Sequence, residues 1–111
     1  MEFKRLNNMT GSDPVMNRRI TSIFLHDFEA FKELFVSITQ HKQMDQIKFA
    51  LHKIKPSLVI FELDDLINQY DELMQIAQTE GLTSQHQEKL SSTIKETEIK
   101  IGKVKNFLAS L

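Results

Sequence analysis

The chain contains no cysteine and very few of the residues that interrupt helices. Its 111 residues include only 2 prolines and 3 glycines. Without cysteine the chain can form no disulfide, no thiolate nucleophile and no cysteine-ligated zinc or iron–sulfur site. So few glycines and prolines also argue against a series of tight hairpins and against a glycine-rich phosphate-binding loop. A chain of this length supports one domain with one apolar core.

The sequence also lacks an excess of charge of either sign and a long apolar run. Lys and Arg number 14 against 15 Asp and Glu, a net charge of −1, so no global basic field favours nucleic acid. The longest apolar run is the four-residue stretch Leu58-Val59-Ile60-Phe61, which is too short to span a membrane. No apolar stretch typical of a signal peptide follows the first charged residues. We therefore expect a soluble, cytoplasmic domain that binds neither nucleic acid nor membrane.

Four segments carry apolar residues at the three- and four-residue spacing of amphipathic helices. They begin at about 15, 44, 63 and 84, and the first two end at about 39 and 61. Short links between amphipathic helices, and no stretch that alternates with period two, favour an all-α antiparallel four-helix bundle over 15–111. Residues 1–14 show no periodicity and are expected to form a flexible N-terminal segment.

Capping patterns mark where these helices begin and end. Asp13 followed by Pro14 is typical of a cap and first-turn proline. Gly81 is a candidate for the left-handed residue that ends the third helix. Ser84 with Gln87 three residues later has the pattern of a capping box for the fourth helix.

The last predicted helix carries a strict heptad seam. Its positions alternate four- and three-residue steps: Leu90, Ile94, Thr97, Ile101, Val104, Leu108 and Leu111. Such a seam is typical of coiled-coil contacts, although inside a bundle it faces the core. An alternative function is therefore a non-catalytic adaptor, or a module that associates with itself through this helix.

The sequence lacks the motifs of a metal site or an enzyme. No Glu is followed three residues later by His, as a di-iron bundle requires, and neither a zinc motif nor a nucleophile elbow is present. His26, His41 and His86 lie among polar neighbours or in links, where we expect solvated side chains. We predict no metal, no cofactor and no enzymatic activity.

His52 differs from the other histidines because of its position on the second predicted helix. Projection at 100° per residue places it about 140° from the apolar stripe, on the solvent side. Lys48 and Lys55 lie on the same side, one turn before and after it. Pro56 cannot donate a hydrogen bond to the carbonyl of residue 52, so we expect a kink at His52.

Apolar residues that the stripe does not use lie on the outer half of the same helix. These are Phe49, Pro56, Val59 and Ile60. Exposed apolar side chains around a histidine usually mark a contact surface. Phe49 and Pro56 lie farthest from the stripe. Val59 and Ile60 are equally compatible with a second core face.

The stretch Ala50-Leu51-His52-Lys53-Ile54-Lys55-Pro56-Ser57-Leu58 resembles the signature of histidine phosphotransfer (HPt) domains. The family pattern is His, an aliphatic residue two positions on, Lys at the third, a small residue (usually Gly) at the fourth, and Ser or Ala at the fifth. Pro56 departs from the usual Gly, as in a variant familiar in some HPt branches. Glu62 departs from a common Gly ten residues after the histidine.

The resemblance implies a four-helix phosphocarrier of multistep two-component signalling. His52 would accept a phosphoryl group from a receiver-domain aspartate and pass it to another receiver. Lys55 would offset the charge of that group, while the receiver supplies the acceptor Asp and Mg²⁺. The implied partners are receiver domains of response regulators or hybrid histidine kinases. From the helix projection, and not from the resemblance, we expect the docking surface to consist of Lys48, Phe49, Pro56, Val59 and Ile60. The carrier is expected to be a monomer.

Overall fold

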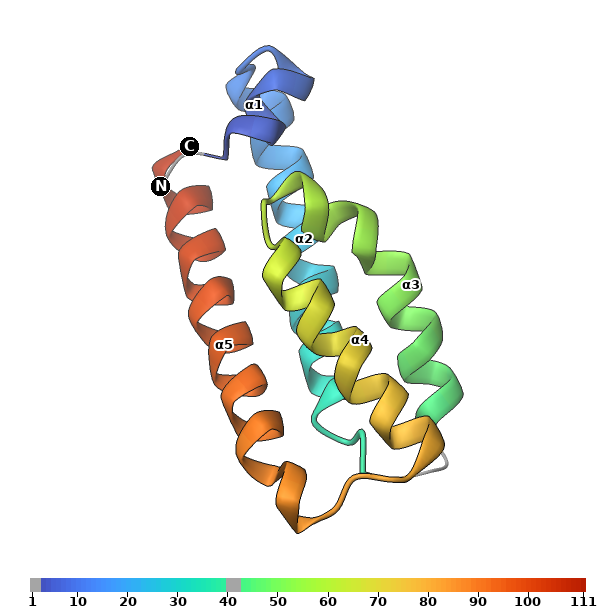
Figure 1. Cartoon of the computed structure of the whole chain (residues 1–111). Coiled ribbons are helices and arrows are strands. Elements are labelled where there is room, and N and C mark those ends of the chain that lie inside the picture. The colour runs from blue at the N-terminus through green and yellow to red at the C-terminus, as the bar shows by residue number, and fades with distance from the viewer. Residues whose placement is uncertain (1–2, 40–42) are drawn as a thin grey trace.

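The computed structural model describes residues 3–39 and 43–111, and within these ranges it contains helices and turns but no strand. The helices are α1 (Lys4–Thr10), α2 (Pro14–Phe35), α3 (Met44–Ile60), α4 (Asp64–Thr79) and α5 (Gln87–Ser110), with the short 3₁₀ turn η2 (Ser84–His86) before α5 (Figure 1). The all-α prediction is confirmed. Residues 36–39, predicted to continue the first long helix, form a turn. None of the described helices is long and apolar enough to cross a membrane.

The long helices pack around a shared apolar core. α2 packs against α3 and α5, and α4 packs against the same two helices, with α1 resting on α2 at one end (Figure 1). The molecule is elongated, with extents of 45 × 23 × 19 Å. Aromatic rings form much of the core: Phe24 stacks on Phe61 with centroids 4.3 Å apart, and Phe31 and Phe35 both contact Tyr70 edge-on. Most of the buried residues belong to the predicted apolar stripes; Phe3, Leu6 and Phe107 are buried as well and belong to none of them.

Two of the three predicted capping signals are confirmed. The Asp13 carboxylate accepts a hydrogen bond of 2.9 Å from the Val15 N–H and so caps α2. Gly81 has a left-handed φ of 80°, and its N–H donates to the Ile76 carbonyl at 2.8 Å to close α4.

The predicted capping box at Ser84 and Gln87 is wrong by one residue. Thr83 and His86 form it instead: the Thr83 side chain accepts from the His86 N–H, and the Thr83 N–H donates to Nδ1 of His86 at 3.1 Å. An imidazole nitrogen thus takes the place of the Glu or Gln oxygen that the sequence pattern assumes.

The N-terminal residues correct the expectation of a flexible segment over 1–14. Residues 4–10 form α1, and Phe3 and Leu6 are 2% and 0% exposed. The Phe3 ring packs edge-on against Phe61 and Phe107, with centroids 5.1 and 4.9 Å away. Two apolar residues are too few to produce a periodic pattern, yet they are enough to anchor one short helix to the end of the core.

Glu62 occupies a position that favours glycine. Its φ is 58°, and the turn it makes lets the Leu63 N–H donate to the Leu58 carbonyl at 2.8 Å, which ends α3. The Glu62 carboxylate in turn accepts a 2.8 Å hydrogen bond from the Lys4 N–H in the first turn of α1. A carboxylate at a helix N-terminus is stabilising, which offsets the strain of a left-handed non-glycine residue. Glu62 therefore fastens α1 to the α3–α4 turn.

Tyr70 carries the most perturbed ionisable group of the core. Its side chain is fully buried, and its hydroxyl lies 2.5 Å from that of Thr97 on α5. Because the Thr97 hydroxyl donates to the Thr93 carbonyl at 2.8 Å, it is the Tyr70 hydroxyl that donates to Thr97. Burial raises the pKa of Tyr70 from 10.0 to about 12.

We expect this raised pKa to make the fold sensitive to alkali. The unfolded chain releases the Tyr70 proton above pH 10, whereas the folded chain holds it until about pH 12. Stability contributed by the neutral phenol is thus complete below pH 10 and is lost as the pH rises to 12, by about 1 kcal/mol at pH 11. Urea unfolding of the wild type and Tyr70→Phe at pH 8 and 11 measures this loss. Equal pH dependence of the two proteins would contradict it.

Candidate functional site

His52 lies midway along α3 with its side chain exposed to solvent. The stripe Ile47, Leu51, Ile54 and Leu58 faces the core, as the spacing predicts. α3 continues without interruption through Pro56, and its buried face anchors the site to the core. The predicted kink at His52 stays a prediction.

His52 borders an open groove of about 610 Å³ between α3 and α4. From α3 the groove is lined by Asp45, Lys48, Phe49, Leu51, His52 and Lys55, and from α4 by Asp71, Met74, Gln75 and Gln78. The groove thus combines an imidazole, ammonium groups, carboxylates, amides and apolar carbon on one surface. This is room enough for a small anionic group next to the imidazole, with space left for a partner side chain.

The two lysines near His52 differ in their surroundings. Lys55 Nζ lies 2.7 Å from Oδ1 of Asp71 on α4, and both side chains are partly exposed. Lys48 is exposed on the same helix face, one turn before His52. The sequence placed Lys55 beside the histidine, but its carboxylate partner comes from the next helix and was not predicted.

The four apolar residues predicted as a contact surface are exposed to different degrees. Phe49 is 72% exposed, Val59 is 43% exposed and Pro56 is exposed. Ile60 is half-buried and packs against the core, so that much of its side chain belongs to the fold. Of the four, only Phe49 lines the groove with His52. The Val59 carbonyl accepts a hydrogen bond of 2.9 Å from Arg5 of α1.

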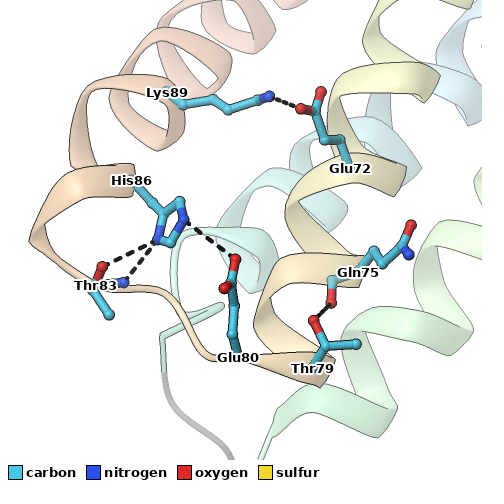
Figure 2. Close-up of polar contacts among 7 residues, drawn as sticks. All are labelled: Glu72, Gln75, Thr79, Glu80, Thr83, His86 and Lys89. Atoms are coloured by element: carbon cyan, nitrogen blue, oxygen red, sulfur yellow. Dashed lines mark hydrogen bonds and ion pairs between the residues drawn. The ribbon is translucent and has the colours of Figure 1, made fainter.

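Neither His26 nor His86 lines this groove. His26 is exposed, as predicted, and His41 lies outside the described residues. His86 corrects the expectation of a solvated side chain: it is 13% exposed, its Nδ1 accepts from Thr83 as described above, and its Nε2 lies 3.7 Å from Glu80 (Figure 2). This histidine therefore serves the connection between α4 and α5.

Figure 2 also shows that side chains of α4 point in different directions. Glu72 forms an ion pair with Lys89 of α5, and the side-chain amide of Gln75 points away from His86. Asp71, the residue before Glu72, turns instead to Lys55 of α3. Adjacent carboxylates of α4 thus serve different neighbours. Across the described residues, no group of three or more His, Asp and Glu side chains is placed to hold a metal ion.

The residues of α4 that line the groove were missed by the sequence analysis. Asp71, Gln75 and Gln78 follow one another in steps of four and three, beside the buried stripe, and this spacing is the only signal they give. No protein-family model, curated protein or solved structure matches the chain. The groove and the motif around His52 are therefore the features of the chain that bear on its function.

Proposed function

We propose that the chain is a histidine phosphotransfer protein whose phosphoacceptor is His52. The observation that carries the proposal is an imidazole exposed at the middle of a long helix, beside a groove that also holds Lys55 one turn away. A phosphoacceptor must reach the active site of another protein, so it requires this exposure. It also requires a nearby cation, because the transferring group is an anion.

The arrangement of the helices supports the same proposal. In Figure 1 the chain direction reverses at each connection from α2 to α5, and each long helix lies beside two others. This is the order expected of an antiparallel four-helix bundle like that of HPt domains, with the phosphoacceptor on its second long helix. We propose that the short α1 is an addition at one end of such a bundle.

In the proposed reaction the Nε2 lone pair of neutral His52 attacks the phosphorus of a receiver aspartyl phosphate. The P–N bond forms as the P–O bond to the aspartate breaks, and the carboxylate leaves with the bonding electrons. The ring then carries a positive charge until its Nδ1 proton passes to water. Attack at a second receiver reverses these steps. Because the receivers supply the aspartate and Mg²⁺, this chain is a carrier and not an enzyme. We propose that it acts in the cytoplasm and as a monomer.

The proposed docking surface consists of Lys48, Phe49, Pro56, Val59 and the exposed part of Ile60. Phe49 is the strongest candidate for its centre, because a large aromatic ring 72% exposed beside the reacting group offers more apolar area than its neighbours. Lys48 adds a positive charge on the same helix face.

Replacement of Phe49 by Glu is expected to weaken receiver binding about tenfold, since a charge replaces an apolar contact at the centre of the interface. Titration calorimetry with a receiver that phosphorylates the wild type measures this change. Ile99→Glu is the matched control, because Ile99 is 46% exposed on α5, which does not line the groove. An affinity for Phe49→Glu equal to that of the control would remove Phe49 from the docking surface.

The experiment that tests the proposal is phosphoryl transfer from a panel of receiver domains. Each receiver is loaded with Mg²⁺ and phosphorylated with a small-molecule donor before the protein is added. Label on this chain that is lost in acid and stable in base supports a phosphohistidine. A folded chain that takes no label from any receiver of the panel would contradict the proposal.

The heptad seam bears on the alternative of a self-associating module. Leu90, Thr97, Ile101 and Val104 of the seam are buried within the chain's own core. A side chain already packed against α2 and α4 offers no surface to a second copy, so the seam favours the carrier over association through α5.

A further inference from the structure

The groove beside His52 carries balanced charge, which is unexpected for a site proposed to hold an anion. Lys48 and Lys55 contribute the positive groups, and Asp45 and Asp71 contribute the negative groups. A site selected only for tight binding of a phosphoryl group would present donors without carboxylates, because a carboxylate repels the anion. The carboxylate paired with Lys55 is therefore the feature to explain.

The Lys55–Asp71 contact joins Lys55, the lysine that matches the HPt pattern, to a different helix. Nζ and Oδ1 are 2.7 Å apart, and the two side chains are 36% and 47% exposed. Exposed pairs of this kind contribute little to stability, so Lys55 can leave Asp71 at small cost. A phosphoryl group carries up to two negative charges and three acceptor oxygens, and is the stronger partner for an ammonium group.

We propose that Asp71 is a positioning residue that competes with the phosphoryl group for Lys55. This inference rests on the proposed function. Asp71 holds Lys55 at the edge of the groove while His52 is unmodified. After transfer, the ammonium exchanges its carboxylate partner for a phosphoryl oxygen. The competition lowers the affinity of the site for the phosphoryl group, as a carrier that must release its cargo requires.

A direct test uses inorganic phosphate as the probe and needs no partner protein. Phosphate is titrated at constant ionic strength while the ring C–H resonances of His52 are followed by NMR. Asp71→Asn is expected to bind phosphate about threefold tighter than the wild type, since the substitution frees Lys55 and removes a repelling charge. Asp71→Glu keeps the competing carboxylate and is expected to restore the wild-type affinity.

Glu72→Gln is the matched control. It removes one negative charge from the adjacent residue of α4, but that carboxylate pairs with Lys89 of α5 (Figure 2). The control is expected to bind phosphate as the wild type does, and Lys55→Ala added to Asp71→Asn is expected to abolish the gain. The proposal is overturned if Asp71→Asn binds like the wild type, if Glu72→Gln gains as much, or if the gain survives without Lys55.

A second measurement connects the competition to transfer. At equilibrium with a phosphorylated receiver, the ratio of phosphorylated to free His52 is expected to rise about threefold in Asp71→Asn, because Lys55 then favours the phosphorylated form. A wild type that is labelled, with an unchanged ratio in Asp71→Asn, overturns the role of Asp71 and leaves the carrier proposal intact. A wild type that no receiver labels overturns the carrier proposal, whereas the phosphate titration reports separately on Asp71 and Lys55.

Discussion

Replacement of His52 by Gln is expected to abolish labelling by phosphorylated receivers, with no acid-labile phosphate detected on the chain. Gln keeps a polar side chain of similar reach but has no nitrogen lone pair able to attack phosphorus. Because His52 is exposed on α3, the free energy of unfolding should change by less than about 0.5 kcal/mol. Circular dichroism and urea unfolding would establish that the variant is folded in the same preparation that is assayed.

His26→Gln is the control for this experiment. His26 is likewise exposed on a long helix, but it lies on α2 and does not line the groove, so this variant should be labelled at the wild-type rate. Labelling of His52→Gln at that rate would show that a different side chain is the acceptor. Loss of label from both variants would point to a general effect of removing a histidine.

Replacement of Phe3 by Ala is expected to lower the free energy of unfolding by about 3 kcal/mol, which is the lower end of the range found when a buried phenylalanine is truncated. The ring is 2% exposed and contacts Phe61 and Phe107, so its loss leaves a cavity where α1 meets the core. The measurement is urea denaturation followed by circular dichroism. A loss of this size is a large fraction of the total stability of a small domain.

Met9→Ala provides the comparison within the same helix. Met9 is 54% exposed, and its truncation should change the free energy of unfolding by no more than about 0.5 kcal/mol. If Phe3→Ala were as mild as Met9→Ala, residues 3–10 would be as loosely held as the sequence alone predicts. The pair therefore tests whether α1 is part of the cooperative fold.

The helices were predictable because their signals are local. The apolar stripes of α2 to α5, the Asp13 cap and the turn at Gly81 depend on residues within a few positions of each other. α1 was missed because its stabilisation comes from contacts that span the chain: the Phe3 ring on Phe61 and Phe107, and the Glu62 carboxylate on the Lys4 N–H. The capping box was predicted one residue too late, at Ser84 and Gln87, because the motif normally has Glu or Gln where this chain has His86.

The candidate site divides in the same way. The sequence by itself determined the all-α fold class and that His52, Lys48 and Lys55 share an outer helix face, because helical periodicity fixes which side chains of one helix lie together. Only the tertiary structure decided that Asp71 of α4 pairs with Lys55, that Glu72 turns to α5, and that Ile60 belongs partly to the core. The spacing along α4 orders its side chains around the axis but not the neighbour that each one meets. That choice follows from how the four long helices pack, and it brings a carboxylate 16 positions away in the sequence to the lysine beside His52.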